Sequence, residues 1–267
     1  MKTHDAVARE TVARATYIGG PTILLEVDGL RLLTDPTFDP AGSEYTTPVY
    51  TLRKTQSAAI PAENLGRVDA VLLSHDHHFD NLDRAGRTIL AHATRVITTP
   101  VGAERLGSPA VGVTPWQTIE IPMPNERTLL VTGTPARHGP PDGDRGPVTG
   151  FVVRLADRPD DAIYISGDTV WYDGVADVAR RFRVRVAVLF MGAARVREVG
   201  PAHLTFAAGE GPTAARAFPD AAIVPLHYEG WEHFSEGRPL IERAFAEAGL
   251  ASRVRWLEPG VPTDLRP

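Results

Sequence analysis

The chain contains no cysteine among its 267 residues. This absence excludes disulfide bonds and thiolate metal ligands, so any metal site must be built from histidine, aspartate or glutamate. A cysteine-free composition fits the reducing environment of the cytoplasm, where we expect the protein to work. Lysine is also scarce, because Lys2 and Lys54 are the two lysines of the chain and arginine supplies its other basic side chains.

The sequence also lacks a long hydrophobic run. Its longest apolar stretch, Val186 to Ala194, covers about half the length of a membrane-spanning helix, so we expect no membrane span. The segment from Met1 to Thr16 is polar and charged and lacks the apolar region of a secretory signal peptide. A net charge of −5 and a pI near 6.0 give no bulk attraction to nucleic acid or anionic membranes. These observations favour a cytoplasmic protein with a small-molecule partner and no nucleic-acid partner.

The length and composition indicate one globular domain. Hydrophobic residues make up 43% of the chain, and no low-complexity linker or strong internal repeat divides it, so we expect a single domain over residues 1–267. Strands are predicted at 11–17, 22–27, 30–33, 68–73, 96–98, 118–121, 128–131, 148–155, 162–165, 184–190 and 221–225. Helices are predicted at 81–92, 101–106, 173–182, 205–218 and 238–248, and 40–55 is predicted as an irregular loop. A β-rich half followed by an alternating β/α half favours an α+β fold with helices covering the outer faces of sheets.

The most informative segment is His75–Asp83, which reads HDHHFDNLD and directly follows the apolar run 70–73. Its nine positions contain three histidines and three carboxylates. The whole chain of 267 residues has nine histidines, so this density is unusual. Imidazole nitrogen and carboxylate oxygen are the ligands that zinc and similar divalent cations prefer. A loop that leaves a buried strand can direct such side chains to one point. The segment therefore predicts a metal site.

Four other polar residues stand at or just after the ends of predicted strands: Asp35, His138, Asp168 and His227. Side chains on loops at strand ends can converge over a rigid sheet. Each residue alone has a simpler explanation. Asp35 suits a turn before proline, and Asp168 suits the cap of the next helix. His138 suits a loop histidine, and His227 a hydrogen-bonded buried one. The recurrence of the pattern favours a shared site.

With these residues in place, the sequence resembles the metallo-β-lactamase-fold hydrolases from about Tyr17 to Trp231. The opening strand pair, which ends in Leu33-Thr34-Asp35-Pro36, is similar to the branch that contains sugar-lactone and phospholipase-D-like hydrolases. This resemblance implies a four-layer αββα sandwich with metal at one edge between two sheets. It also implies metal-dependent hydrolysis of an ester, lactone or phosphodiester-type bond in a small molecule.

The family pattern His-x-His-x-Asp-His is followed by a distant histidine, a bridging aspartate and a final histidine. The resemblance assigns the last three positions to His138, Asp168 and His227. The first motif departs from the pattern, because counting from Ser74 makes His77 the second histidine, whereas counting back from Asp80 makes it His78. We favour His75 and His78 as ligands, with His77 as the alternative. Asn81 stands where the family has a histidine ligand, and Gly20 stands where the family has another histidine near the first strand turn.

The implied metal ligands are therefore His75, His77 or His78, Asp80, His138, Asp168 and His227. We expect one tightly bound Zn²⁺ and a second, weaker one, because Asn81 is a poor ligand; Mn²⁺ or Fe²⁺ could replace zinc. The resemblance also suggests catalytic roles for three residues. Asp80 would orient or deprotonate the attacking water, Asp168 would bridge the metals, and His203 would approach the substrate. A helix-flanking histidine is the simpler explanation of His203.

Two other function classes are compatible with these residues. The same ligands suit iron, so an iron-binding redox protein is one alternative, although no flavin-binding domain is visible in the sequence. A non-hydrolytic binding or regulatory protein with a degraded site is the other, and Asn81 favours it. The sequence indicates neither the substrate nor the oligomeric state.

Overall fold

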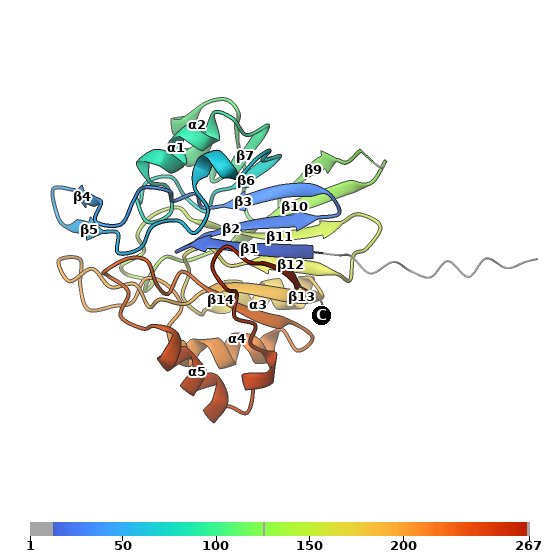
Figure 1. Cartoon of the computed structure of the whole chain (residues 1–267). Coiled ribbons are helices and arrows are strands. Elements are labelled where there is room, and N and C mark those ends of the chain that lie inside the picture. Colours follow the sequence, from blue (N-terminus) through green and yellow to red (C-terminus); the bar gives the residue numbers. More distant parts are fainter. Residues whose placement is uncertain (1–12, 125, 266–267) are drawn as a thin grey trace, which may run out of the picture.

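A computed structural model of the protein describes residues 13–124 and 126–265. Most of the N-terminal segment considered above, including the first two residues of the strand expected at 11–17, lies outside the described residues. Two β-sheets form the centre of the molecule, and helices lie on both outer sides (Figure 1). Within the described ranges no helix is long and apolar enough to cross a membrane.

The first sheet has seven strands in the order β15-β1-β2-β3-β6-β7-β8. Neighbours from β15 to β3 are antiparallel, and β3, β6, β7 and β8 run parallel. Its strands are β1 (Ala13–Gly19), β2 (Thr22–Val27), β3 (Leu30–Thr34), β6 (Ala70–Leu72), β7 (Arg95–Thr98), β8 (Ala110–Gly112) and β15 (Pro262–Leu265).

The second sheet has six strands in the order β14-β13-β12-β11-β10-β9. Strands β12, β13 and β14 are parallel, and the others pair antiparallel. Its strands are β9 (Thr118–Pro122), β10 (Thr128–Pro135), β11 (Thr149–Leu155), β12 (Ala162–Ile165), β13 (Val184–Phe190) and β14 (Ala222–Leu226).

Helices complete the outer layers. The helical elements are α1 (Arg84–Leu90), α2 (Pro100–Leu106), α3 (Asp173–Arg181), α4 (Gly211–Ala217), α5 (Arg238–Glu247) and the 3-10 turns η1 (Ala62–Asn64), η2 (Ala208–Glu210) and η3 (Ala251–Arg253). Apolar residues of α1 pack on the first sheet, and those of α3, α4 and α5 pack on the second. The expected four-layer αββα sandwich is confirmed, with α1 and α2 on one side and α4 and α5 on the other (Figure 1).

The continuous apolar runs are explained by this layering. In β6, Ala70 and Leu72 belong to the core between the sheets, whereas Val71 packs in the outer core beneath α1. In β13, Val188 packs between the sheets and Leu189 packs toward the helices. Successive side chains of a strand point to opposite faces, so a strand covered on both faces is apolar at every position.

Three expectations about local structure were wrong. The helix expected at 205–218 is a 3-10 turn at Ala208–Glu210 followed by α4 from Gly211. The first helix begins at Arg84 rather than Asn81, because the Asp83 side chain accepts a hydrogen bond from the Gly86 N–H and caps the helix. Residues 81–83 are thereby left in the loop. The segment 40–55 is not wholly irregular, since β4 (Glu44–Thr46) and β5 (Thr51–Arg53) form a hairpin there. Beside the hairpin, Lys54 forms a buried ion pair with Asp83 at 2.9 Å.

Candidate metal centre

The histidines and carboxylates predicted from the sequence come together at one end of the two sheets. The loop after β6 carries His75, His78 and Asp80, and the loop after β10 carries His138. Asp168 follows β12, and His227 follows β14. Of the three carboxylates in 75–83, Asp76 pairs with Arg105 and Asp83 pairs with Lys54, which leaves Asp80 for this site.

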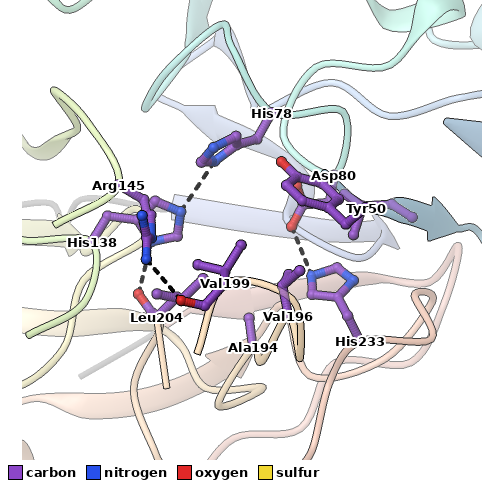
Figure 2. Close-up of a pocket in the computed structure, with 11 residues that line it drawn as sticks. Tyr50, His78, Asp80, His138, Arg145, Ala194, Val196, Val199, Leu204 and His233 are labelled. Atoms are coloured by element: carbon purple, nitrogen blue, oxygen red, sulfur yellow. Dashed lines mark hydrogen bonds and ion pairs between the residues drawn. The ribbon is translucent and has the colours of Figure 1, made fainter. Parts of the chain in front are cut away.

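A first group of donors consists of three imidazole nitrogens. His75 Nε2 lies 2.9 Å from His78 Nδ1, and His78 Nδ1 lies 3.1 Å from His138 Nε2. Figure 2 shows the rings of His78 and His138 facing each other. Two ligands about 2.0–2.1 Å from a tetrahedral zinc ion lie roughly 3.3 Å apart. The nitrogen spacing therefore suits a single small cation.

Neighbouring groups fix which nitrogen of each ring is free. His138 Nδ1 lies 2.8 Å from the Leu204 carbonyl oxygen, to which it can only donate, so Nε2 keeps its lone pair. On the other side, the Ser74 hydroxyl lies 2.9 Å from His75 Nδ1 and 2.8 Å from Asp35 Oδ1. A chain of donation from His75 through Ser74 to Asp35 leaves His75 Nε2 with its lone pair directed at the cluster.

A second group of donors consists of Asp80, Asp168 and His227, all buried. His227 Nε2 lies 3.4 Å from Asp80 Oδ2 and 3.8 Å from Asp168 Oδ1. The other oxygen of Asp168, Oδ2, lies 3.6 Å from His138 Nε2. Asp168 therefore stands between the two groups, one oxygen toward each. His227 has a φ of 53°, a left-handed conformation uncommon for a residue with a side chain, and its N–H donates to the Gly20 carbonyl oxygen at 3.0 Å.

The electrostatics of these groups suit a cation. Burial lowers the pKa of His78 to about 3 and the pKa of His138 to about 4, so both rings are neutral near pH 7. Burial raises the pKa of Asp168 well above its usual range, and the carboxylates of Asp80 and Asp35 raise it further. Asp168 Oδ2 and His227 Nδ1 have no hydrogen-bond partner among residues 13–124 and 126–265. Neutral imidazoles beside crowded, unpartnered carboxylate oxygens are the environment that a bound divalent ion would stabilise.

Asn81 lies between the first loop and Asp168. Its side-chain nitrogen donates to Asp168 Oδ1 at 3.3 Å and to the Ser74 hydroxyl at 3.4 Å. It therefore presents N–H groups, not a lone pair, to the carboxylate that separates the two donor groups. Asn81 orients Asp168 in this arrangement.

His77 and His78, the two candidates for the second histidine of the motif, have different surroundings in the structure. The exposed ring of His77 has its Nε2 2.9 Å from the Arg145 carbonyl oxygen, to which it donates. His78 instead directs Nδ1 at His75 and His138. His77 can still approach a cation, because one of its nitrogens lies within 4.8 Å of donor atoms of His75 and His78. Because His77 is hydrogen-bonded to the Arg145 carbonyl oxygen, His78 is favoured as the histidine that faces the other donors.

This difference gives a direct test. We expect His78→Ala to lose most bound metal and nearly all activity, because it removes one of three converging imidazoles. His77→Ala should keep most of both, because it removes a hydrogen bond at the rim. Metal content after dialysis, measured by elemental analysis, compares the two variants. The opposite ranking would establish the register counted from Ser74.

His203 lies outside this group. Its Nε2 is 3.3 Å from Glu210 Oε2, and the hydrogen bond and charge of Glu210 raise the pKa of His203. The described residues that line the cleft do not include it. The structure thus places His203 at the start of the η2–α4 segment, and its catalytic role stays a prediction.

A cleft opens over the donors. Its walls come mainly from the β4–β5 hairpin, the loops around residues 138–145 and 194–204, and the loop after β14 (Figure 2). The lining residues are Tyr50, Leu52, His78, Asp80, His138, Arg145, Ala194, Val196, Val199, Leu204 and His233.

His233 is the residue of this cleft that the sequence analysis missed. It lies 3.0 Å from Asp80 Oδ2 through its Nε2. The available signal was its position six residues after His227, within the aromatic run Trp231-Glu232-His233-Phe234. The cleft walls were also not predicted, because they depend on how the hairpin packs against distant loops.

The chain is similar in sequence and fold to known proteins. UPF0173 protein YddR of Bacillus subtilis (strain 168) is 23% identical over 258 residues, covering 92% of this chain and 97% of that protein. A UPF0173 metal-dependent hydrolase of Caldivirga maquilingensis is 26% identical over 245 residues, covering 91% and 94%. The crystal structure of isothiocyanate hydrolase from Delia radicum gut bacteria superposes with a TM-score of 0.78 at 23% identity, covering 94% of this chain and 98% of that one.

The family described as the beta-lactamase superfamily domain matches residues 30–228. That match runs from β3 to just past β14 and so includes the His75 cluster, His138, Asp168 and His227. The chain belongs to the beta-lactamase superfamily.

Proposed function

We propose that this protein is a metal-dependent hydrolase that cleaves an ester, lactone or phosphodiester-type bond of a small molecule. The observation that carries the proposal is the position of Asp168 between two groups of buried donors, at 3.6 Å from His138 and 3.8 Å from His227. The names of the UPF0173 relatives as metal-dependent hydrolases support the same reading. The narrower branch and the cytoplasmic location stay predictions.

The proposed metal is zinc, held by His75, His78 and His138, with Asp80, Asp168 and His227 holding a second, weaker ion. Mn²⁺ or Fe²⁺ would suit the same nitrogen and oxygen ligands. When bound, such an ion polarises the substrate and lowers the pKa of water. Asp168 would bridge the two ions and balance their charge, since each of its oxygens lies near a different donor group.

Asp80 is the proposed group that orients the attacking water. It lines the cleft, whereas Asp168 does not. Burial alone would raise the pKa of Asp80, but contacts with His233 and His227 hold this pKa well below its usual range, so the carboxylate stays ionised. An ionised carboxylate at the cleft wall can accept hydrogen bonds from water and so orient it.

The cleft favours a compact substrate with an apolar portion. Leu52, Val196 and Val199 line it. Arg145 is the one arginine among its described lining residues, which include no lysine. The Arg145 guanidinium donates to the Val199 carbonyl oxygen at 3.1 Å. Arg145 is thus the one guanidinium group among the cleft residues that the structure describes, and it already donates to a backbone carbonyl oxygen. Such a cleft suits an uncharged ester or lactone better than a phosphodiester.

An activity screen tests the proposal. Metal-loaded protein is assayed against small apolar esters, lactones, thioesters and phosphodiesters, with His75→Ala as the control that removes a buried donor. We expect hydrolysis of an ester or lactone that depends on added zinc and is lost in His75→Ala. Tightly bound iron with oxygen-dependent turnover would favour the redox alternative. Metal uptake without turnover of any class would favour a binding or regulatory protein.

A further inference from the structure

The second donor group has one imidazole, His227, whereas the resemblance to the metallo-β-lactamase-fold hydrolases implies a further one at position 81. Asn81 occupies the position of that imidazole, and its amide N–H groups are committed to Asp168 and Ser74. An amide N–H donates hydrogen bonds and cannot ligate a metal through nitrogen. Asp80, Asp168 and His227 are left as the donors of this group, with two of the three being carboxylates.

We propose that His233 supplies the missing imidazole from a different loop. His233 Nε2 lies 3.0 Å from Asp80 Oδ2, and His227 Nε2 lies 3.4 Å from the same oxygen. Both separations are close to the roughly 3.3 Å expected between two ligands of one tetrahedral zinc ion. Figure 2 shows the His233 ring turned toward Asp80 across the cleft from His78 and His138. This inference rests on the metal site of the proposed function.

The loop that carries His233 is held on both sides. The Glu232 N–H donates to the Arg53 carbonyl at 3.0 Å, and the Arg195 N–H donates to the His233 carbonyl at 2.9 Å. The ring itself is 9% exposed and packs against Phe234 with the ring centroids 4.6 Å apart. A side chain held in this way needs little rearrangement to bind an ion.

The contact between His233 Nε2 and Asp80 Oδ2 is compatible with a hydrogen bond from a neutral imidazole or with a cation held by both atoms. A lone pair on Nε2 facing a carboxylate oxygen at 3.0 Å would be repulsive, so either a proton or a cation must lie between them. The buried Nδ1 of His233 has no partner within the described structure. His227 Nε2 lies 3.4 Å from the same Asp80 oxygen, and this favours a cation, because a cation can contact both imidazoles and the oxygen whereas a proton joins only one pair.

The test is a metal titration of the full-length, chelator-treated chain with Co²⁺, followed by calorimetry and by visible absorption. Wild type should show two binding events. In both His233→Ala and His233→Gln, we expect the second event to weaken by more than the roughly 10–100-fold typical of losing an outer partner of a ligand. The first event should stay unchanged. His92→Ala, which removes an exposed histidine after α1, should titrate like wild type.

Each of the other outcomes contradicts either the metal site or the role of His233. If wild type takes up no Co²⁺, the proposed function itself fails. If wild type shows two events and both His233 variants keep them unchanged, the metal site stands and the role of His233 is wrong. His233→Gln keeps a side chain that can donate to Asp80. Retention of the second event in this variant alone would make His233 a hydrogen-bond donor and overturn its assignment as a ligand. If His233→Ala fails to fold, His233→Gln decides by the same criterion.

Discussion

Replacing Asp168 with asparagine is expected to lower turnover by roughly 10²–10³-fold or more, the loss typical of removing one preorganised electrostatic group from an active site. Asp168 is fully buried and directs one oxygen toward each donor group. Asparagine keeps the shape and one oxygen but removes the charge that balances the bound cations. Affinity for the second metal should fall most, since Asp168 is one of the two carboxylates among the donors Asp80, Asp168 and His227.

The fold should survive this change. Without metal, burial and the neighbouring carboxylates oppose ionisation of Asp168, so a neutral side chain removes an unfavourable charge. The metal-free Asp168→Asn protein should therefore melt at the same temperature as metal-free wild type, or higher. Asp160→Asn, an exposed change in the β11–β12 turn, is the matched control. Near-native activity and metal content in Asp168→Asn would remove the bridging role from the proposed mechanism.

Replacing Lys54 with methionine is expected to lower the free energy of unfolding by about 3–5 kcal/mol, the usual cost of breaking a buried ion pair at one partner. Lys54 Nζ lies 2.9 Å from Asp83 Oδ2, and the two side chains are 4% and 0% exposed. Asp83 also accepts from the Asp39 N–H at 2.7 Å and caps α1. Methionine would leave this carboxylate buried without its cation. Denaturant unfolding followed by circular dichroism measures the loss.

The neighbouring residue provides the control. Arg53 pairs with Glu44 at 2.6 Å, but the two side chains are 51% and 52% exposed. Arg53→Met should therefore cost no more than about 1 kcal/mol. Adding Asp83→Asn to Lys54→Met should recover part of the loss, because the amide keeps the helix cap without a buried charge. Equal costs for Lys54→Met and Arg53→Met would show that burial does not govern the strength of these pairs.

Much of the fold was predictable because burial dictates side-chain type along each strand. A strand covered on both faces is apolar at every position, as in β6 and β13, and the alternating β/α half requires helices outside a sheet. The inner side chains of the site were predictable for a related reason. His75, His138, Asp168 and His227 each follow the end of a strand, and these strand ends lie at the same end of the two packed sheets.

The features that escaped prediction depend on contacts between distant segments. His233 gains significance through Asp80, which is 153 positions away in the sequence. The β4–β5 hairpin is short and half exposed, so its strands lack the apolar alternation that marks a longer strand. The start of α1 was misplaced because Asp83, inside an apparently helical stretch, is drawn into a cap and an ion pair with Lys54.

The buried position of Lys54 gives the protein a natural chemical reporter. A charged amine enclosed beside Asp83 and 5.6 Å from the Trp231 ring is shielded from reagents that acylate lysine. Lys54 also pairs through its backbone with Trp231, two residues before His233. Its rate of acylation therefore measures how often this wall of the cleft opens. Because Lys2 is the other lysine of the sequence, mass spectrometry can follow that opening at Lys54 without an introduced label.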